Sequence, residues 1–170
     1  CISSAASEVY KRQTKGAAEM QARAFAEMTH CGDKSTEACV LYTRMVYLLT
    51  ESVGNFQDGD VADFLHECLK GTCYDGSVEA AATYAAGGYV VDSMSTAVSC
   101  LAHAQTFEEA VCAAANLGGD TDTNAAITGG LAGAWFGFSA IPARWVDALA
   151  PGLRQDLDIL AAAAESHRNK

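Results

Sequence analysis

The amino-acid sequence predicts an all-α fold, and three observations lead to that conclusion. Apolar residues make up 50% of the 170 residues and aromatic residues only 8%, a balance that favours closely packed helices over a β-sandwich. From Lys15 onward, apolar residues recur at three- and four-residue intervals, which is the period of an amphipathic helix. Strand-like alternation is missing, and only Tyr89-Val90-Val91 is expected to be extended. The length suits one domain with a sizeable core.

Two helices are expected in the first third of the chain. The first begins near Lys15 and ends between His30 and Gly32, because glycine favours a helix end. The face that it is expected to bury consists of Ala18, Ala22, Phe25 and Met28. Ser35 or Thr36 is expected to cap the second helix. The inward stripe of that helix is expected to consist of Leu41, Met45, Leu48 and Leu49.

Two further helices are expected before the middle of the chain. A third helix opens at Asp58 or Asp60 and stops at Gly71. Its inward residues are expected to be Val61, Phe64, Leu65 and Cys68. Ser77 is expected to cap a fourth helix over residues 78–86, which ends at the glycine pair that follows.

The second half is also helical by pattern. Asp92 and Ser93 are expected to cap a helix that runs to His103, and Thr106 with Glu109 forms a capping box before another. The remaining helices are expected over residues 110–116, 123–136, 144–150 and 153–165. Glycines within 123–136 lower helix propensity, so we expect neighbouring helices to approach closely there. The aromatic residues expected in the core are Trp135, Phe136 and Phe138.

Charge and cysteine content exclude several classes of partner. The 21 acidic residues outnumber the 11 basic ones, and no Lys/Arg cluster suited to a nucleic-acid backbone occurs. No apolar run approaches the roughly 18 residues that a membrane span requires. The seven cysteines form no Cys-x-x-Cys pair and lie mostly in apolar helical stretches. They therefore indicate reduced thiols in a cytoplasmic protein and disfavour a zinc site.

The run from Asn116 to Asn124, NLGGDTDTN, is the most informative part of the sequence. Two carboxylates and a hydroxyl within four positions offer the hard oxygen ligands that Mg²⁺, Mn²⁺ or Ca²⁺ require. Gly118 and Gly119 allow a sharp bend and a close approach to a ligand. Local chemistry leaves a second interpretation open, in which the run is only a helix start with Asp122 as its N-cap.

Three segments together resemble the ADP-ribosylglycohydrolase family, which includes the dinitrogenase reductase-activating glycohydrolases. They are Asn116–Gly137 (NLGGDTDTNAAITGGLAGAWFG), Ala24–Cys39 (AFAEMTHCGDKSTEAC) and Gly87–Ala97 (GGYVVDSMSTA). The resemblance runs from about Gly16 to Glu165 and implies a compact orthogonal helical domain whose N-terminal half is missing. We therefore expect residues 14–170 to be the C-terminal part of one such domain.

Residues 1–13 are expected to be a non-native leader. The pentapeptide Val9-Tyr10-Lys11-Arg12-Gln13 resembles the translation of a common sequencing adaptor, and an ordinary basic tail is the alternative.

The resemblance implies a binuclear centre of two divalent cations, Mg²⁺ or Mn²⁺. Asp120, Asp122 and Thr123 match the family's ligands, with Asp122 expected to bridge the two ions. Asp120 and Asp122 thereby become the residues assigned to catalysis. The remaining ligands are implied to come from an acidic Thr-Asp-Asp cluster in the half that is missing. A general acid or base cannot be named from this chain.

Three further residues match segments that the family uses to bind ADP-ribose. His30 lies where the family places a pocket histidine, and a histidine that meets the last carbonyls of its helix is the alternative. Gly88 and Tyr89 match a loop that passes the nucleotide end of the substrate. Tyr89 either flanks the base or fills a gap between helices.

The implied function is metal-dependent hydrolysis of the glycosidic bond that joins ADP-ribose to a modified protein side chain or a related conjugate. The expected partner is an ADP-ribosylated protein or a small ADP-ribosyl conjugate, and the protein is expected to be a monomer. With half of the centre missing, the chain alone is expected to be inactive. The alternative is a non-catalytic ADP-ribose-binding or crystallin-like protein on the same fold.

Overall fold

A computed structural model of the chain describes residues 14–30, 32–51, 60–80 and 88–168. The helices are α2 Lys15–Thr29, α3 Asp33–Glu51, α4 Val61–Leu69, α5 Val90–Ala102, α6 Phe107–Asn116, α7 Thr121–Phe136, α8 Ala143–Asp147 and α9 Pro151–Arg168. Two short 3₁₀ turns are η1 Asp75–Ser77 and η2 Phe138–Ala140. No strand occurs in these ranges, and the predicted all-α class is confirmed.

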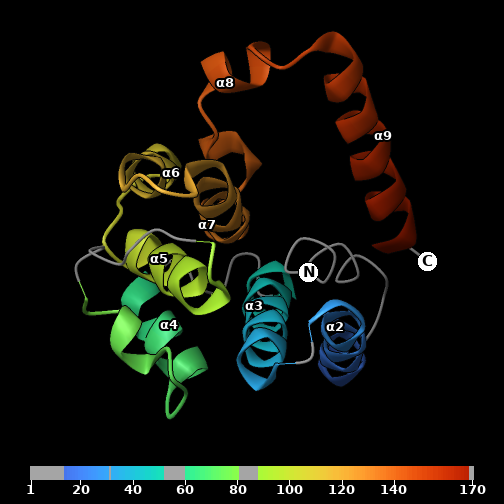
Figure 1. The fold of residues 1–170 in the computed structure, drawn as a ribbon. Coiled ribbons are helices and arrows are strands. Elements are labelled where there is room, and N and C mark those ends of the chain that lie inside the picture. Colours follow the sequence, from blue (N-terminus) through green and yellow to red (C-terminus); the bar gives the residue numbers. More distant parts are fainter. Residues whose placement is uncertain (1–13, 31, 52–59, 81–87, 169–170) are drawn as a thin grey trace.

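Helix α7, which carries the acidic motif at its start, packs against three other helices (Figure 1). It packs against α6, α5 and α3, while α4 covers the other side of α3 and α5, and α2 packs on α3. The core between these helices contains fully buried large side chains. Among them are Met45, Leu65, Leu69, Met94, Leu101 and Leu131, each 0% exposed. This packing fixes the beginning of α7, where the acidic motif lies.

Helix α2 buries a narrower face than the sequence pattern predicts. Ala18, Ala22 and Ala26 are at most 1% exposed, whereas Phe25 is 39% and Met28 79% exposed. Small side chains let two helix backbones approach closely, and a stripe of alanines therefore forms the contact with α3. The expected inward positions of Phe25 and Met28 are wrong.

The predicted inner faces of α3 and α4 largely agree with the structure. Leu41, Met45 and Leu49 of α3 are buried, and so are Val61, Phe64 and Leu65 of α4. Leu48 and Cys68 are partly buried against the same core.

The predicted helix boundaries are partly wrong here. Helix α3 begins at Asp33, before both of the expected caps, and Thr36 is a buried residue within the helix. The start of α4 is confirmed, because the Asp60 carboxylate accepts a hydrogen bond from Ala62 N at 3.0 Å. After α4 the chain turns at Gly71, whose φ is +75°.

Ser77 does not cap a helix. It lies in η1 and its hydroxyl is 3.0 Å from the Ser95 hydroxyl of α5, while residues 78–80 form a turn and a bend. Residues 81–86 of the expected fourth helix lie outside the described residues.

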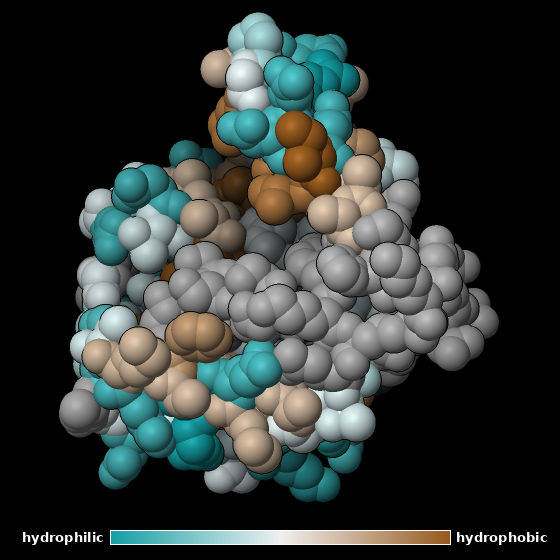
Figure 2. All heavy atoms as spheres, turned by 90° about the vertical axis from the view of Figure 1, so that its right-hand side faces the viewer, coloured by the Kyte–Doolittle hydropathy of each residue, from teal (hydrophilic) through white to brown (hydrophobic). Residues whose placement is uncertain are grey.

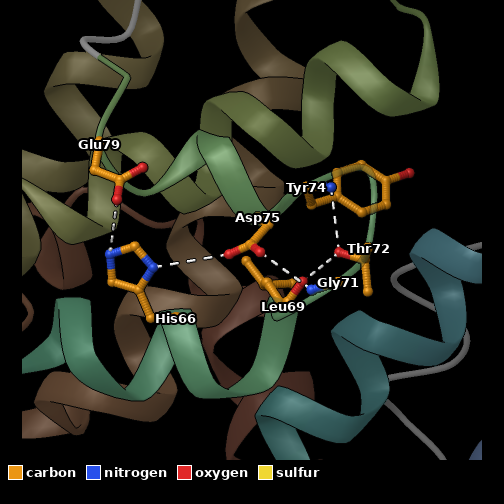
Figure 3. A network of polar contacts seen from close by, with 7 residues as sticks. All are labelled: His66, Leu69, Gly71, Thr72, Tyr74, Asp75 and Glu79. Carbon is orange, nitrogen blue, oxygen red and sulfur yellow. Dashed lines mark hydrogen bonds and ion pairs between the residues drawn. The ribbon is translucent and has the colours of Figure 1, made fainter.

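A surface network holds the loop that joins α4 to η1 (Figure 3). His66 lies between two carboxylates, 3.9 Å from Asp75 Oδ1 and 3.4 Å from Glu79 Oε1. The other Asp75 oxygen accepts a hydrogen bond from Gly71 N at 3.1 Å. Because His66 and both carboxylates are solvent-exposed to a third or more, these pairs contribute little to stability.

Helix α5 begins earlier than expected. Tyr89 is its N-cap, with the extended backbone angles φ −76° and ψ 128°, but Val90 and Val91 already belong to the first turn. Asp92 and Ser93 therefore lie inside the helix and are not caps. By contrast, Thr106 caps α6 as predicted, since Glu109 N donates to Thr106 Oγ1 at 3.1 Å. The Glu109 carboxylate completes the cap by accepting a hydrogen bond from Gln105 N at 2.8 Å, one residue before the position that a capping box predicts.

The C-terminal part projects from the body of the molecule. In Figure 1, α8 and α9 extend beyond the packed helices. Figure 2 shows the right-hand side of that view, and its upper part contains apolar side chains among hydrophilic ones. Residues 151–163 are all exposed. The large apolar residues among them are Leu153, Leu157, Ile159 and Leu160. Phe138 is also 76% exposed, so its expected place in the core is wrong, whereas Trp135 and Phe136 pack against the core.

Within the part of the chain that is described, none of the helices is long and apolar enough to cross a membrane.

Candidate metal-binding turn

Two glycines with left-handed backbone angles make the turn between α6 and α7. Gly118 has φ +81° and Gly119 has φ +68°, a region that L-residues with a side chain adopt at a cost. The chain thus reverses within a few residues after Asn116, and α7 starts at once. The sharp bend that the sequence predicts at these glycines is confirmed.

The acidic residues lie at the first turn of α7, and Asp122 does not take the N-cap position that the second interpretation gave it. The N-cap is Asp120 and not Asp122, and the Asp120 side chain makes no capping hydrogen bond. Asp122 lies in the first helical turn. The positive end of the helix dipole favours carboxylates at these positions. Because the Asp120 carboxylate bonds no helix N–H, it remains available as an oxygen ligand.

The three predicted ligands differ in exposure. Asp120 is half-buried, while Asp122 and Thr123 are exposed at the surface of the helix start. Their oxygens are the hard donors that Mg²⁺ and Mn²⁺ prefer, so the residues present fit part of a divalent-cation centre. Across the described ranges no three His, Cys, Asp or Glu residues converge in a metal-binding group. The turn by itself therefore supplies an incomplete set of ligands.

Helix α7 is held in place by a contact with α3 that the motif does not reveal. The buried Tyr42 hydroxyl donates a hydrogen bond to the Ile127 carbonyl oxygen at 3.0 Å. A Cβ at Gly130 would lie 2.1 Å from the same hydroxyl oxygen. Only glycine leaves room for it, which agrees with the close helix approach that the sequence predicts for this region. Tyr42 itself was missed, because a tyrosine in an apolar stripe carries no signal of its partner.

The structure brings the predicted loop of Gly88 and Tyr89 to the acidic turn. A Cβ at Gly88 would lie 2.9 Å from Asp120 Oδ2, so the Gly88 backbone lies directly against that carboxylate. Tyr89 follows and is 54% exposed. This exposure excludes the interpretation of Tyr89 as a residue that fills a gap between helices.

His30 is the C-cap of α2. Its backbone N–H donates to Ala26 O at 2.8 Å, and its ring Nδ1 is 3.0 Å from Thr29 Oγ1. The ring is exposed and contacts this hydroxyl, not the last carbonyls of the helix.

A cavity of about 750 Å³ lies between α2 and α3, and the sequence did not predict it. Its lining comes from these two helices, Gly32 and the loop after α4. Part of the Ala24–Cys39 segment lines it, but none of the predicted site residues does. The charged residues that line it are Arg23, Glu27, Asp33, Glu37 and Arg44. Arg44 is already paired with Glu19 at 2.7 Å, and its neighbours include both signs of charge, so the cavity shows no preference for one ligand class.

Comparison with known proteins decides the family. The family model described as ADP-ribosylglycohydrolase matches residues 3–170. The chain belongs to this family. The resemblance inferred from the three sequence segments is thereby confirmed.

Relatives and a solved structure agree with the assignment to the ADP-ribosylglycohydrolase family. ADP-ribosyl-[dinitrogen reductase] glycohydrolase of Rhodospirillum rubrum is 32% identical in an alignment of 146 residues that covers 82% of this chain and 47% of that protein. ADP-ribosylarginine hydrolase Tri1 of Serratia proteamaculans (strain 568) is 45% identical over 62 residues, covering 36% of this chain and 17% of Tri1. A solved chain from an ADP-ribosylglycohydrolase-related protein complex matches with a TM-score of 0.74 and 29% identity, over 95% of this chain and 56% of that one.

The chain spans less than half the length of these curated relatives. The likeness therefore covers only part of each relative, and the activity of a whole family member is a matter for proposal.

Proposed function

We propose that the protein to which these residues belong is a hydrolase that removes ADP-ribose from a modified protein side chain or a related conjugate. The family match over residues 3–170 supports the reaction class. The observation that carries the proposal to this chain is the turn at α7, where Asp120 occupies the N-cap without a capping bond. A carboxylate that serves only as a cap would bond the helix N–H groups.

Asp120, Asp122 and Thr123 would provide oxygen ligands to two divalent cations in this proposal. Bound there, Mg²⁺ or Mn²⁺ supplies Lewis-acid polarisation and a template for the ribose hydroxyls and a water. The residues of the chain keep the ligand oxygens in place: the glycine turn sets their direction, and the contact of Tyr42 with α7 fixes the helix that carries them.

His30, Gly88 and Tyr89 would bind the ADP-ribose moiety. Support comes from the exposed positions of His30 and Tyr89 and from the contact between Gly88 and Asp120, which joins the loop to the acidic turn. An exposed aromatic ring at the start of α5 can stack against an adenine base. ADP-ribosylarginine is the first substrate to test, because Tri1 of Serratia proteamaculans, named above, is an ADP-ribosylarginine hydrolase.

We further propose that the 170-residue chain is inactive alone and monomeric. Two carboxylates and one hydroxyl leave two cations short of the six ligands that Mg²⁺ takes, and water alone orients them poorly. Purified chain incubated with ADP-ribosylarginine and Mg²⁺ is expected to release no ADP-ribose, and light scattering is expected to give the mass of one chain. Robust release by the chain alone would refute this part.

The metal site is tested by thermal melting with and without Mn²⁺. A ligand that binds the folded state raises its stability by about 2.7 kcal/mol at 100 times its dissociation constant. We expect Mn²⁺ to raise the Tm of the chain. The double variant with Asp120→Asn and Asp122→Asn should not show that rise. An unchanged rise in the double variant would refute ligation at this turn, and so would a Tm that never responds to Mn²⁺ or Mg²⁺. The latter result would support a non-catalytic protein.

A further inference from the structure

The contact between Gly88 and Asp120 explains why a glycine stands at position 88. The backbone of Gly88 is outside the left-handed region, which the glycines with positive φ occupy (Gly71, Gly118, Gly119 and Gly137). Conformational freedom is therefore not the reason for a glycine here. A Cβ built at this position would meet Asp120 Oδ2 at 2.9 Å and Asp120 Cγ at 3.9 Å, and no other described atom outside its chain neighbours within 4 Å. The carboxylate occupies the space that a side chain would need.

We infer that Gly88 is a positioning residue for the Asp120 carboxylate: its missing side chain leaves the space in which that oxygen ligand lies. The inference rests on the proposed function, since it concerns a ligand of the proposed cation centre. It adds a second role to the substrate contact proposed for Gly88, namely that of leaving room for the Asp120 carboxylate. In this arrangement Gly88 acts on the cation through Asp120.

Gly88 and Asp120 belong to different parts of the chain, so the contact between them forms only when those parts pack together. Asp120 stands at the N-cap of α7, and Gly88 stands just before α5, whose N-cap is Tyr89. Helices α5 and α7 pack directly on each other. The packing of the two helices therefore sets the distance between the loop and the carboxylate, and the Tyr89 loop and the metal ligand are placed together.

A methyl group at position 88 would displace the carboxylate and leave the fold intact. An ordinary contact between carbon and another heavy atom needs about 3.5 Å, so Asp120 Oδ2 must move by about half an ångström or change rotamer. The obstacle is the end of a side chain, and the backbone can stay in place. Oxygen ligands of Mg²⁺ lie at about 2.0–2.1 Å in near-ideal geometry, which tolerates no such displacement. Loss of groups that orient metal ligands typically lowers metal affinity by about 10–100-fold.

The first experiment tests the contact without metal. Gly88→Ala, Asp120→Ala and the double variant are melted in EDTA as a double-mutant cycle. Gly88→Ala is expected to lower Tm by about 2–4 °C in the presence of Asp120, and by much less in the Asp120→Ala background. Gly76→Ala is the matched control, because its Cβ would meet nothing within 4 Å and its φ is not positive. Equal effects of Gly88→Ala in both backgrounds would overturn the inference.

The second experiment tests the consequence for the cation. Mn²⁺ affinity of the 170-residue chain is measured by titration calorimetry for wild type, Gly88→Ala, Asp120→Asn and the double variant. We expect Gly88→Ala to weaken Mn²⁺ binding about 10–100-fold, Gly76→Ala to leave it unchanged, and the double variant to bind like Asp120→Asn alone.

The outcomes separate the two proposals. If Asp120→Asn weakens Mn²⁺ binding and Gly88→Ala does not, the positioning role is wrong and the proposed metal site stands. If Asp120→Asn has no effect, or the chain binds no Mn²⁺, the proposed metal site fails and the positioning role fails with it. If the double variant binds markedly more weakly than Asp120→Asn, Gly88 acts by another route and the inference is overturned.

Discussion

The contact between Tyr42 and Gly130 gives the sharpest test of how the motif helix is held. Tyr42 of α3 is 3% exposed, and its hydroxyl donates to Ile127 O of α7 at 3.0 Å. Gly130→Ala would place a methyl carbon 2.1 Å from that hydroxyl oxygen and 3.4 Å from the ring carbon Cζ. Unlike the Asp120 carboxylate at Gly88, this obstacle is a buried ring that has little room to move. The hydroxyl group and the added methyl cannot both stay in place.

The expected magnitudes follow from that geometry. Overpacking by one methyl costs about 1–3 kcal/mol, and alanine in place of glycine inside a helix returns about 1 kcal/mol. Gly130→Ala alone should thus destabilise the chain by up to about 2 kcal/mol. Tyr42→Phe loses one hydrogen bond, worth about 1 kcal/mol. In the double variant the hydroxyl is gone and a 3.4 Å contact to the ring needs only a small shift. Its stability should therefore be close to that of wild type.

Urea unfolding followed by circular dichroism measures all four free energies, with unchanged m-values as the sign of an unchanged fold. Two independent losses of stability would add to about 1–3 kcal/mol, whereas the contact predicts recovery in the double variant. Gly129→Ala is the matched control, because its Cβ would be an ordinary 3.6 Å from Val111 Cγ2 and should give only the gain in helix propensity. A Gly130→Ala variant as stable as Gly129→Ala, or a double variant less stable than Gly130→Ala, would show that the reasoning is wrong.

Three further predictions concern the turn, a cap and the cysteines. Gly118→Ala should lower the free energy of unfolding by about 1–2 kcal/mol. The φ of Gly118 is +81° and a Cβ there would meet no atom within 4 Å, so only backbone strain opposes the alanine. An unchanged urea midpoint would contradict this. Thr106→Ala should cost about 1 kcal/mol by removing the hydrogen bond to Glu109 N, and Thr106→Ser should restore most of it in the same assay. Burial raises the pKa of Cys68 to about 11, so its alkylation should lag behind that of the exposed Cys73 at pH 8 and should accelerate up to about pH 11. Because the unfolded thiol ionises at a lower pH than the folded one, this group should also lower stability as pH rises from 9 towards 11, and Cys68→Ala should weaken that dependence.

The helical class and the inner faces of most helices could be predicted because they depend on residue periodicity. Leu41, Met45 and Leu49 follow the helical period with large apolar side chains, and all three are buried. Periodicity failed at α2, where Phe25 and Met28 share the period with alanines but lie exposed. The pattern shows which residues share a face but not how closely the partner helix approaches. At a close contact the small residues are the buried ones.

The helix starts show a second limit, which concerns side chains that have two possible partners. Thr106 and Asp60 cap the helices as predicted, because the nearest N–H groups are their best partners. Ser77 has the same local chemistry, yet its hydroxyl bonds Ser95, which is 18 residues away in the sequence. Local sequence cannot reveal that choice, since the competing partner arrives only when α5 packs.

At the acidic turn, local sequence determines the chemistry, whereas packing against a distant segment determines the geometry. The chemistry could therefore be predicted and the geometry could not. Paired glycines before two aspartates predict a tight turn with exposed oxygens, and the left-handed angles of Gly118 and Gly119 agree. Which aspartate would be the N-cap depends on how the turn closes, and Asp120 takes that place without bonding the helix. Its carboxylate instead lies against Gly88, 32 residues earlier in the chain. If the Asp120 carboxylate were simply a solvated side chain at a helix start, an alanine at position 88 would be indifferent to it. The coupling between positions 88 and 120 therefore distinguishes a built ligand position from an ordinary acidic helix start, before any metal is added.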